Sequence, residues 1–251
     1  MDFVAMRIKS FVCYKGTRYQ GFQIQASSEE KSIQGEIQRV LSQIFSREIK
    51  IVGSGRTDKG VHALKQCFHF DVDKEVDLVK LKRSANCLLP SDIHILSFER
   101  VPDDFHARFD VKDKTYRYIV NTGEYDPIEE ELLYNYNRPL DIGKIAEAGN
   151  LLIGEHSFHN FCCNDDDFVR TVYAFRVWKE KEKVIMELNG NGFRRYMVRM
   201  IVGTLIEVGS GRMDVDRFGE YLSEMKSRVS YKAPASGLYL ADIRYGGEND
   251  D

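Results

Sequence analysis

The sequence lacks the features that direct a chain to a membrane or to the outside of a cell. It contains no apolar run approaching the roughly 20 residues needed to cross a bilayer. Its first residues, Met1–Arg7, have neither a basic start nor a long apolar segment, so they do not resemble a signal peptide. Five cysteines, an odd number at irregular spacing, argue against a disulfide framework and favour a reducing compartment. We therefore expect a soluble, cytoplasmic protein with no membrane partner.

An excess of positive charge is also missing. The net charge is -3 and the pI is about 6.1, so composition alone does not indicate a nucleic-acid partner. The charges are nevertheless segregated, with acidic clusters at residues 129–131 and 165–167. Basic residues gather at Lys15/Arg18, Arg56/Lys59, Lys80/Lys82/Arg83 and Arg194/Arg195/Arg199. Such clusters are usually solvated surface, but they are also compatible with a local basic groove, because phosphates respond mainly to charges within a Debye length of about 10 Å.

Hydrophobic periodicity predicts alternating strands and helices in the first half of the chain. Strand-like alternation begins at residues 7–14, and Ser32 is a typical N-cap for a helix that continues to about residue 44. The remaining predicted elements are strands at 50–53 and 66–72, a helix at 78–88 that stops before Pro90, and a strand at 93–100. This β-α-β-β-α-β order is that of a ferredoxin-like unit.

The second half repeats the plan. The predicted elements are a strand at 115–121, a helix from Asp141 to Leu152, a hairpin of strands 171–178 and 184–189, a helix at about 195–208, a short helix carrying Phe218, Leu222 and Met225, and a strand at 238–245. We therefore expect an α+β fold of two ferredoxin-like units, at residues 1–104 and 105–251. A mainly antiparallel sheet would join the units, with an active-site cleft between them.

The segment from Gly53 to Ala63 is the candidate site. Its glycines and charged residues lie between two apolar runs, which predicts a tight loop between strands that could let a ligand approach the main chain. Read alone, Asp58-Lys59-Gly60 is also typical of an ordinary hairpin turn. Arg56 and Lys59 flank Asp58, and nearby positive charge keeps a carboxylate ionised and able to act as a nucleophile or base. A phosphate-binding P-loop is excluded, because Val61-His62 stands where that motif requires Lys followed by Ser or Thr.

Arg199 is the unusual residue of the second half, because the predicted helix around it is apolar on almost every side. A buried guanidinium without a partner costs several kcal/mol, so a carboxylate is expected nearby. Glu207 or another acid would give a structural pair, whereas Asp58 would give a pair across the cleft. Gly203 lies one turn further along the same face, where another segment of backbone could approach.

Two further groups of residues were weighed as sites. Phe105-His106-Ala107-Arg108-Phe109 and Tyr116-Arg117-Tyr118 place aromatic and basic residues together, either as core or as a surface on which a nucleobase stacks for roughly 1–3 kcal/mol. His156, His159, Cys162 and Cys163 match no zinc pattern, so we expect no metal.

Seven motifs in order resemble the TruA family of tRNA pseudouridine synthases over nearly the whole chain. They begin with residues 14–23 (Tyr14 to Gln23), the loop 55–63 and residues 86–93. They continue with 105–109 together with 116–118, then 154–158, then Gly192-Phe193 with 197–199 and 201–203, and finally Ala233-Pro234 with 237–240. Lys59 and Met200 depart from the residues common in the family, which are alanine and asparagine.

The resemblance implies an enzyme that converts uridine to pseudouridine in the anticodon arm of tRNA, at positions 38–40, without a cofactor or metal and as a homodimer. It implies that Asp58 is the essential residue, that Tyr116 packs on the target base, that Arg199 pairs with Asp58, and that Arg56 holds the base out of the stack. Candidate RNA contacts are Lys15, Arg18, Lys59, His62, Arg108, Arg194 and Arg195. Attack of Asp58 at C1′, deprotonation of the sugar toward a glycal and addition to C6 all remain open.

Two other functions were considered. A non-catalytic RNA-binding protein made of two ferredoxin-like units would usually carry an RNP1-type strand, which this sequence lacks. A hydrolase that uses an aspartate on a phosphorylated small molecule would need a metal site or a phosphate loop, and the sequence offers neither.

Overall fold

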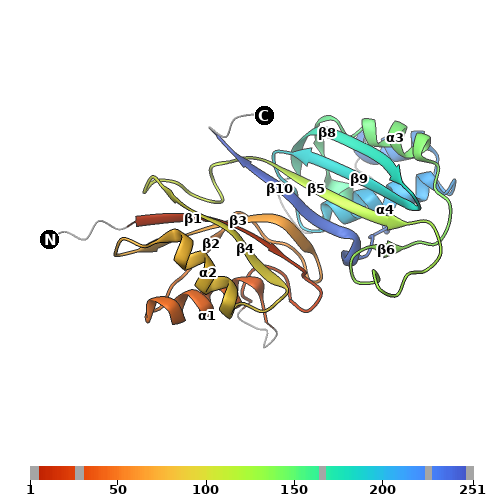
Figure 1. The fold of residues 1–251 in the computed structure, drawn as a ribbon. Helices are drawn as coiled ribbons and strands as arrows, with labels where there is room; N and C mark the ends of the chain where they lie inside the picture. Colours follow the sequence, from red (N-terminus) through yellow and green to blue (C-terminus); the bar gives the residue numbers. More distant parts are fainter. Residues whose placement is uncertain (1–5, 26–30, 164–167, 224–227, 247–251) are drawn as a thin grey trace. The chain divides into compact units, whose positions relative to one another are not determined.

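The computed structural model describes residues 6–25, 31–163, 168–223 and 228–246. The chain divides into two compact units (Figure 1). Unit 1 consists of residues 1–112 and 240–251, and unit 2 of residues 113–239. The sequence predicts two domains, 1–104 and 105–251, each able to fold independently. A division into compact units does not test independent folding, so the two domains remain a prediction. Within the described residues, no helix has the length and apolar character required to cross a membrane.

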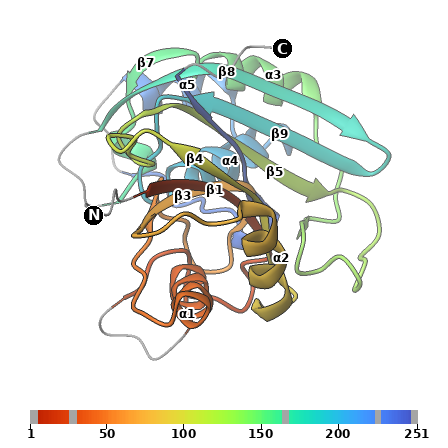
Figure 2. The same ribbon diagram turned by 60° about the vertical axis from the view of Figure 1, so that its left-hand side comes forward.

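Unit 1 is a mainly antiparallel sheet with two helices on one side (Figure 2). Its elements are β1 (Met6–Tyr14), α1 (Ile33–Phe45), β2 (Val52–Gly53), β3 (His62–Val72), α2 (Leu78–Leu88), β4 (Ile93–Val101) and β10 (Leu238–Tyr245), the last reached after unit 2. The strand order is β4-β1-β3-β10, and β2 pairs with β3. The predicted β-α-β-β-α-β order is confirmed for residues 6–101.

The helices of unit 1 begin where the sequence places their caps. The Ser32 hydroxyl accepts a hydrogen bond from the Gly35 N–H at 3.1 Å, and the Asp77 carboxylate accepts from Val79 and Lys80. These caps satisfy N–H groups that the first turn of a helix leaves unpaired. The apolar stripe of α1 is buried, and α2 ends one residue before Leu89-Pro90 because proline cannot continue a helix.

The strands of unit 2 are also mainly antiparallel, with helices on one side (Figure 1). Its elements are β5 (Val111–Asn121), which begins two residues before the unit, β6 (Tyr134–Asn135), α3 (Ile142–Asn150), β7 (Gly154–Ser157), β8 (Val169–Glu180), β9 (Lys183–Gly190), α4 (Met197–Gly209) and α5 (Val215–Ser223), with 3₁₀ turns at His159–Phe161 and Ala235–Gly237. The strand order is β5-β9-β8-β7, and β6 runs parallel to β5. Helix α4 is buried along almost its whole length.

The structure corrects several predicted boundaries. β3 starts at His62 rather than at residue 66, and β2 is confined to Val52–Gly53. Helix α4 starts at Met197, so Arg194 and Arg195 lie in the turn before it. β6 and β7 were not predicted, because two and four residues are too short for a clear alternation.

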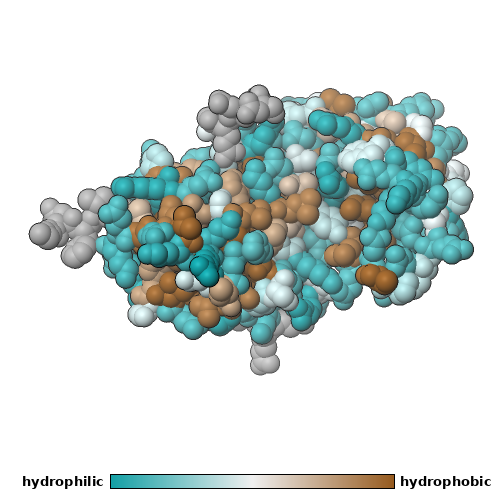
Figure 3. Space-filling view, viewed as in Figure 1, coloured by the Kyte–Doolittle hydropathy of each residue, from teal (hydrophilic) through white to brown (hydrophobic). Residues whose placement is uncertain are grey.

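Two predictions fall on residues that the structure does not describe, namely the acidic cluster 165–167 and the helical position of Met225. The fold as a whole is mixed α and β with mainly antiparallel strands, and the ferredoxin-like character of the two units stays a prediction. On the face shown in Figure 3, hydrophobic residues gather in patches between hydrophilic ones.

Candidate active site

Asp58 lies in a short loop of unit 1, between the end of β2 at Gly53 and the start of β3 at His62. We call residues 54–61 the Asp58 loop. Asp58 is half-buried, whereas Arg56 and Lys59 are exposed. Directly after Asp58 the chain turns: the Val61 N–H donates to the Asp58 carbonyl at 3.1 Å, and Gly60 adopts a φ of 79° that suits glycine.

A second loop, residues 15–22, packs its backbone directly against the Asp58 loop, and we call it the bracing loop. A Cβ atom on Gly16 would lie 1.9 Å from the Val61 carbonyl oxygen, and one on Gly21 would lie 2.3 Å from that of Thr57. The Phe22 N–H donates to the same Thr57 oxygen at 3.2 Å. Only glycine fits at positions 16 and 21, because any side chain would push the two loops apart.

The space beside Gly53 is filled by the chain itself. A Cβ atom there would lie 2.2 Å from the ring of Phe22. The sequence suggested that the glycines of this segment admit a ligand. At Gly53, the structure shows instead that glycine admits an aromatic ring of the bracing loop.

Hydrogen bonds to buried side chains also hold the Asp58 loop in place. The Tyr14 and Thr57 hydroxyls lie 2.9 Å apart, and the Gly16 N–H donates to His62 Nδ1 at 3.0 Å. Burial raises the pKa of Tyr14 far above its usual value, so the phenol stays neutral. Ser54 bonds to Gln66, whose amide donates to the Gly55 carbonyl at 3.3 Å. Asp58 is thus held on a loop that has few ways to move.

Four predicted RNA contacts of unit 1 lie at or beside the two loops: Lys15 and Arg18 in the bracing loop, Lys59 in the Asp58 loop, and His62 at the start of β3. His62 is only 1% exposed and supports the bracing loop, so its role toward RNA stays a prediction. Arg18 is exposed and donates to Asp92 through Nε at 3.0 Å and Nη2 at 2.6 Å. The Lys15 N–H donates to the Asp92 carbonyl at 2.9 Å, so that part of the bracing loop is held at its backbone.

Arg108, another predicted RNA contact, lies in a turn that is tied to unit 1 at Ala107. The Ala107 N–H donates to His69 Nδ1 at 3.1 Å, and its carbonyl accepts from the Tyr245 hydroxyl at 2.6 Å. Burial, followed by the nearby Arg7 guanidinium, lowers the pKa of His69 to about 4, so that its Nδ1 accepts at neutral pH. The neighbouring Phe109 is 75% exposed.

In unit 2, Tyr116 and Tyr118 project from the same face of β5, and their environments differ. Tyr118 is fully buried and donates to the Pro234 carbonyl at 2.8 Å, and burial holds its pKa well above the usual value. Tyr116 is half-buried, with its ring edge-on to Phe193 at 5.2 Å. Arg117 lies on the opposite face and pairs with Glu187 at 2.8 Å. The predicted alternation is confirmed, and the half-buried Tyr116 is the one that keeps ring surface for a ligand.

Arg199 of α4 binds a backbone segment, residues 231–234, which we call the clamped segment. Arg199 Nε donates to the Ala233 carbonyl at 2.7 Å, and the Ala233 N–H donates to the Arg199 carbonyl at 3.0 Å. A Cβ atom on Gly203 would lie 2.3 Å from the Tyr231 carbonyl oxygen, so the predicted close approach of a backbone at this glycine is confirmed. Glu207, one of the partners considered for Arg199, is paired with Arg212.

Arg194 and Arg195 lie in the turn that leads into α4. Arg195 Nη2 donates to the Tyr196 hydroxyl at 3.0 Å, and the Arg194 carbonyl accepts from the Met197 N–H at 3.0 Å. The cap residue itself, Tyr196, has a φ of 62°, in the left-handed region that non-glycine residues rarely adopt. Nothing in the sequence indicates this conformation.

Two of the four residues weighed as zinc ligands, His156 and Cys162, make hydrogen-bond contacts with backbone carbonyls, whereas the buried His159 Nδ1 has no hydrogen-bond partner among the described residues. His156 Nε2 lies 3.2 Å from the Ile153 carbonyl oxygen, and the buried Cys162 thiol lies 3.2 Å from the Phe158 carbonyl oxygen. Within the part of the chain that the structure describes, no group of three or more His, Cys, Asp or Glu side chains is arranged to hold a metal ion.

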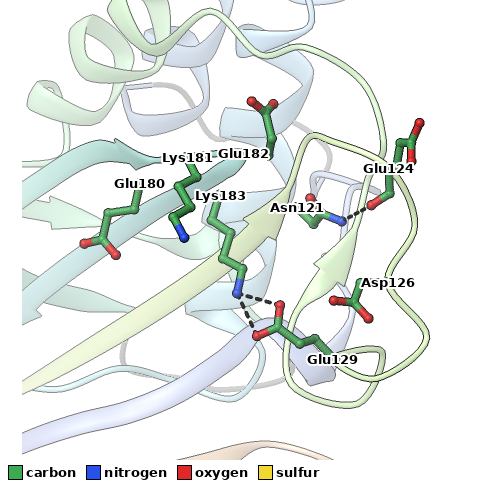
Figure 4. A pocket seen from close by; sticks show the side chains of 8 residues that line it. All are labelled: Asn121, Glu124, Asp126, Glu129, Glu180, Lys181, Glu182 and Lys183. Carbon is green, nitrogen blue, oxygen red and sulfur yellow. Dashed lines mark hydrogen bonds and ion pairs between the residues drawn. The ribbon is translucent and has the colours of Figure 1, made fainter.

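A cavity of about 450 Å³ lies in unit 2, at the turn between β8 and β9 (Figure 4). Its lining carries both signs of charge, and Lys183 is ion-paired with Glu129 across it. It is lined by Asn121, Glu124, Asp126, Glu129, Glu180, Lys181, Glu182 and Lys183. None of the predicted site residues is among them, and the acidic lining does not suit a polyanion.

The sequence matches the family model described as tRNA pseudouridine synthase over residues 11–110 and 148–246. The chain belongs to this family. The two matched stretches contain the Asp58 loop, the bracing loop, α4 and the clamped segment, but not Tyr116. Among curated relatives, the tRNA pseudouridine synthase A of Listeria monocytogenes serotype 4b is 38% identical over 247 residues, covering 95% of this chain and 99% of the relative.

Two other relatives with the same printed name are equally similar. That of Anoxybacillus flavithermus is 39% identical over 244 residues, with 95% of this chain and 98% of the relative covered. That of Latilactobacillus sakei is 39% identical over 251 residues, with 96% and 100% covered. Among solved structures, a Cbf5-Nop10-Gar1 complex matches 96% of this chain and 59% of that chain, at 14% identity and a TM-score of 0.38.

Proposed function

We propose that this chain converts uridine to pseudouridine in the anticodon stem-loop of tRNA, at positions 38–40, with Asp58 as the essential catalytic residue. The family defines the coarser function, because the chain is an isomerase that acts on tRNA uridine. The observation that carries the finer proposal is the Asp58 loop, which presents a half-buried carboxylate from a backbone braced on several sides. Such rigidity holds a reacting group in place without a cost at the moment of reaction.

The reaction exchanges one bond of the uracil ring for another. The N1–C1′ glycosidic bond breaks, the ring turns, C5 bonds to C1′, and the ring loses a proton at C5 while N1 gains one. A carboxylate at Asp58 can serve this exchange as a nucleophile at C1′, as a base at the sugar, or as a nucleophile at C6. Each route needs only the side chain and the substrate, so we propose that the enzyme uses no cofactor or metal.

The target base must leave the helical stack, which costs a few kcal/mol. We propose that Arg56, exposed beside Asp58, occupies the space that the base leaves, and that Tyr116 packs on the extruded base. A stacked aromatic ring contributes about 1–3 kcal/mol per base, which is of the size required.

Arg199 is proposed as the ionic partner of Asp58 during the reaction. Its Nε is engaged with Ala233, and within the described part of unit 2 it forms no ion pair, so the two terminal nitrogens suit a carboxylate. We further propose a homodimer in the cytoplasm, in which one tRNA contacts both subunits. Lys15, Arg18, Lys59, His62, Arg108, Arg194 and Arg195 remain the candidate RNA contacts.

The decisive experiment replaces the carboxylate at constant shape. Asp58→Asn is expected to bind tRNA with near wild-type affinity and to form no pseudouridine, because the amide is neither a base nor a useful nucleophile. Pseudouridine would be mapped in tRNA from cells that lack the gene and carry either the wild type or the variant. The matched control is Asp73→Asn, an exposed aspartate of unit 1 at 3.6 Å from Arg47, where modification should be unchanged. Substantial modification by Asp58→Asn would exclude the catalytic assignment, and pseudouridine at other tRNA positions would exclude the anticodon assignment.

A further inference from the structure

Tyr196 is held in an unfavourable backbone conformation at the start of α4. Its φ of 62° costs a non-glycine residue roughly 1–2 kcal/mol. Glycine would remove that cost, so the tyrosine is retained at the expense of stability. Compared with glycine, tyrosine adds an aromatic ring at this position, and the contacts of that ring indicate its role.

Three cationic side chains surround the ring of Tyr196. The distances from the ring centroid are 4.5 Å to Lys232 Nζ, 4.8 Å to Arg195 Cζ and 5.6 Å to Arg199 Cζ. All three lie within the 6 Å over which an aromatic ring attracts a cation. Lys232 is distant in the sequence from the two arginines, so the ring brings its charge together with those of the turn and of α4.

Lys232 is held in this arrangement by the backbone on both sides of it. The Tyr231 carbonyl packs against Gly203, the Ala233 N–H and carbonyl both bond to Arg199, and the Pro234 carbonyl accepts from the buried Tyr118 hydroxyl. A lysine on a mobile loop would move away from neighbouring positive charges. Lys232 stays close to them because four backbone contacts hold the clamped segment.

The three cations around the ring repel one another. An anion bound between them would remove the repulsion and gain several charge-assisted hydrogen bonds. Lys232 and Arg195 are exposed, so an anion can reach the group from solvent. The natural anion for a protein that acts on tRNA is a phosphodiester of the RNA backbone, which offers two charged oxygens to guanidinium and ammonium donors.

We propose that Tyr196 gathers Arg195, Arg199 and Lys232 into one site that binds a phosphodiester group of the substrate tRNA. Tyr196 is a positioning residue, because it acts through the cations. Only the choice of tRNA as the polyanion depends on the proposed function. The site adds Tyr196 and Lys232 to the RNA contacts predicted from the sequence.

The test is the salt dependence of tRNA affinity. Each phosphate contact contributes roughly 0.7–0.9 to the slope of log affinity against log salt concentration. Lys232→Gln is expected to lower the slope by about 1 and to weaken binding about tenfold. Lys144→Gln, which removes an exposed lysine of α3 in the same unit, should leave the slope unchanged.

Tyr196→Leu gives the most specific readout, because it removes no charge. It keeps the backbone strain and loses the ring, so the cations disperse and the slope should fall by about as much as in Lys232→Gln. Tyr196→Phe keeps the ring and should behave almost like the wild type. A wild-type slope for Tyr196→Leu would overturn the positioning role, and equal slopes for the Lys232 and Lys144 variants would overturn the site.

Two precautions keep the outcomes separable. Should Tyr196→Leu fail to fold, as judged by its melting temperature, Arg195→Gln tests the same site from an exposed position and should also lower the slope by about 1. A wild type that binds tRNA with these variant effects but forms no pseudouridine would exclude the proposed function and keep the phosphate site. A wild type that forms pseudouridine, with no variant changing the slope, would exclude only the phosphate site.

Discussion

The Asp58 loop of unit 1 and the clamped segment of unit 2 are held in similar ways, but by different kinds of residue. Each depends on glycine for a close approach of backbone, at Gly16 and Gly21 in the first and at Gly203 in the second. In unit 1 the supporting side chains, such as Tyr14 and Gln66, are neutral, buried and separate from the proposed functional residues.

In unit 2 the support is itself a proposed functional residue. Arg199 holds the clamped segment through Ala233 and also carries one of the charges around Tyr196. At the Asp58 loop, the residues that support the backbone differ from the proposed catalytic residue, whereas Arg199 has both roles. A substitution of Asp58 should therefore change activity without changing stability, and a substitution of Arg199 should change both.

The largest effect is expected for Gly16→Ala. A Cβ atom 1.9 Å from the Val61 carbonyl oxygen must displace one of the two loops, which should reduce the free energy of unfolding by about 3 kcal/mol or more and lower activity with it. Urea denaturation and a pseudouridine assay measure the two. Gly246→Ala is the control, since nothing lies within 4 Å of its added Cβ. A stable Gly16→Ala protein would mean that the bracing loop does not fix the Asp58 loop.

Arg199→Met should have an intermediate effect on stability and a large one on activity. The Ala233 carbonyl loses its charged donor, which costs about 1.5–3 kcal/mol, and the proposed partner of Asp58 is lost as well. Asp58→Asn, in contrast, should leave the free energy of unfolding within about 0.5 kcal/mol of the wild type. Urea midpoints for the two variants therefore test the comparison directly. If Arg199→Met were as stable as the wild type, a supporting role of this arginine would be excluded.

The smallest effect is a dependence of stability on pH that arises in unit 1. His69 has its pKa lowered from 6.5 to about 4 by burial. The unfolded chain therefore binds a proton at a higher pH than the folded chain, and His69 destabilises the fold progressively as the pH falls from about 6.5 to about 4. Protonation also prevents Nδ1 from accepting the Ala107 N–H.

We expect a loss of about 2 kcal/mol between pH 7 and pH 4.5, measured by urea denaturation at each pH. His69→Gln should flatten the difference, and His94→Gln, at an exposed position of unit 1, should not. The bonds that hold the clamped segment involve no histidine, so the same pH change should leave this segment in place, as followed by hydrogen exchange at the Ala233 amide. Equal pH dependence of the wild type and His69→Gln would exclude the histidine as the cause.

Much of unit 1 could be predicted because its signals are local. The caps Ser32 and Asp77 and the stop at Pro90 act within a few residues of the helix ends they determine. The loop around Asp58 was also predicted from its glycines and flanking strands. Its bracing was not, because Gly16 packs against Val61 and Gly21 against Thr57, and contacts between such distant positions leave no periodic pattern in the sequence.

In unit 2, the sequence singled out Arg199 as anomalous and Gly203 as a point of close approach, and the latter is confirmed. It did not identify the backbone partner of either, because a carbonyl oxygen carries no sequence signal. Tyr196 and Lys232 were missed for a related reason. A left-handed tyrosine cannot be distinguished from a helical one by composition, and an isolated exposed lysine is ordinary.

The last strand, β10, has a consequence for how the protein is made. From Leu240 onward it belongs to unit 1, next to β3, although the whole of unit 2 precedes it in the chain. During synthesis, unit 1 must therefore wait without β10, and without the ion pair of Lys65 with Asp242 and the Tyr245 bond to Ala107, until unit 2 has left the ribosome. The turn carrying Arg108 is completed by a strand that is translated after the whole of unit 2, so a product truncated before Leu240 would retain the Asp58 loop but not a finished unit 1.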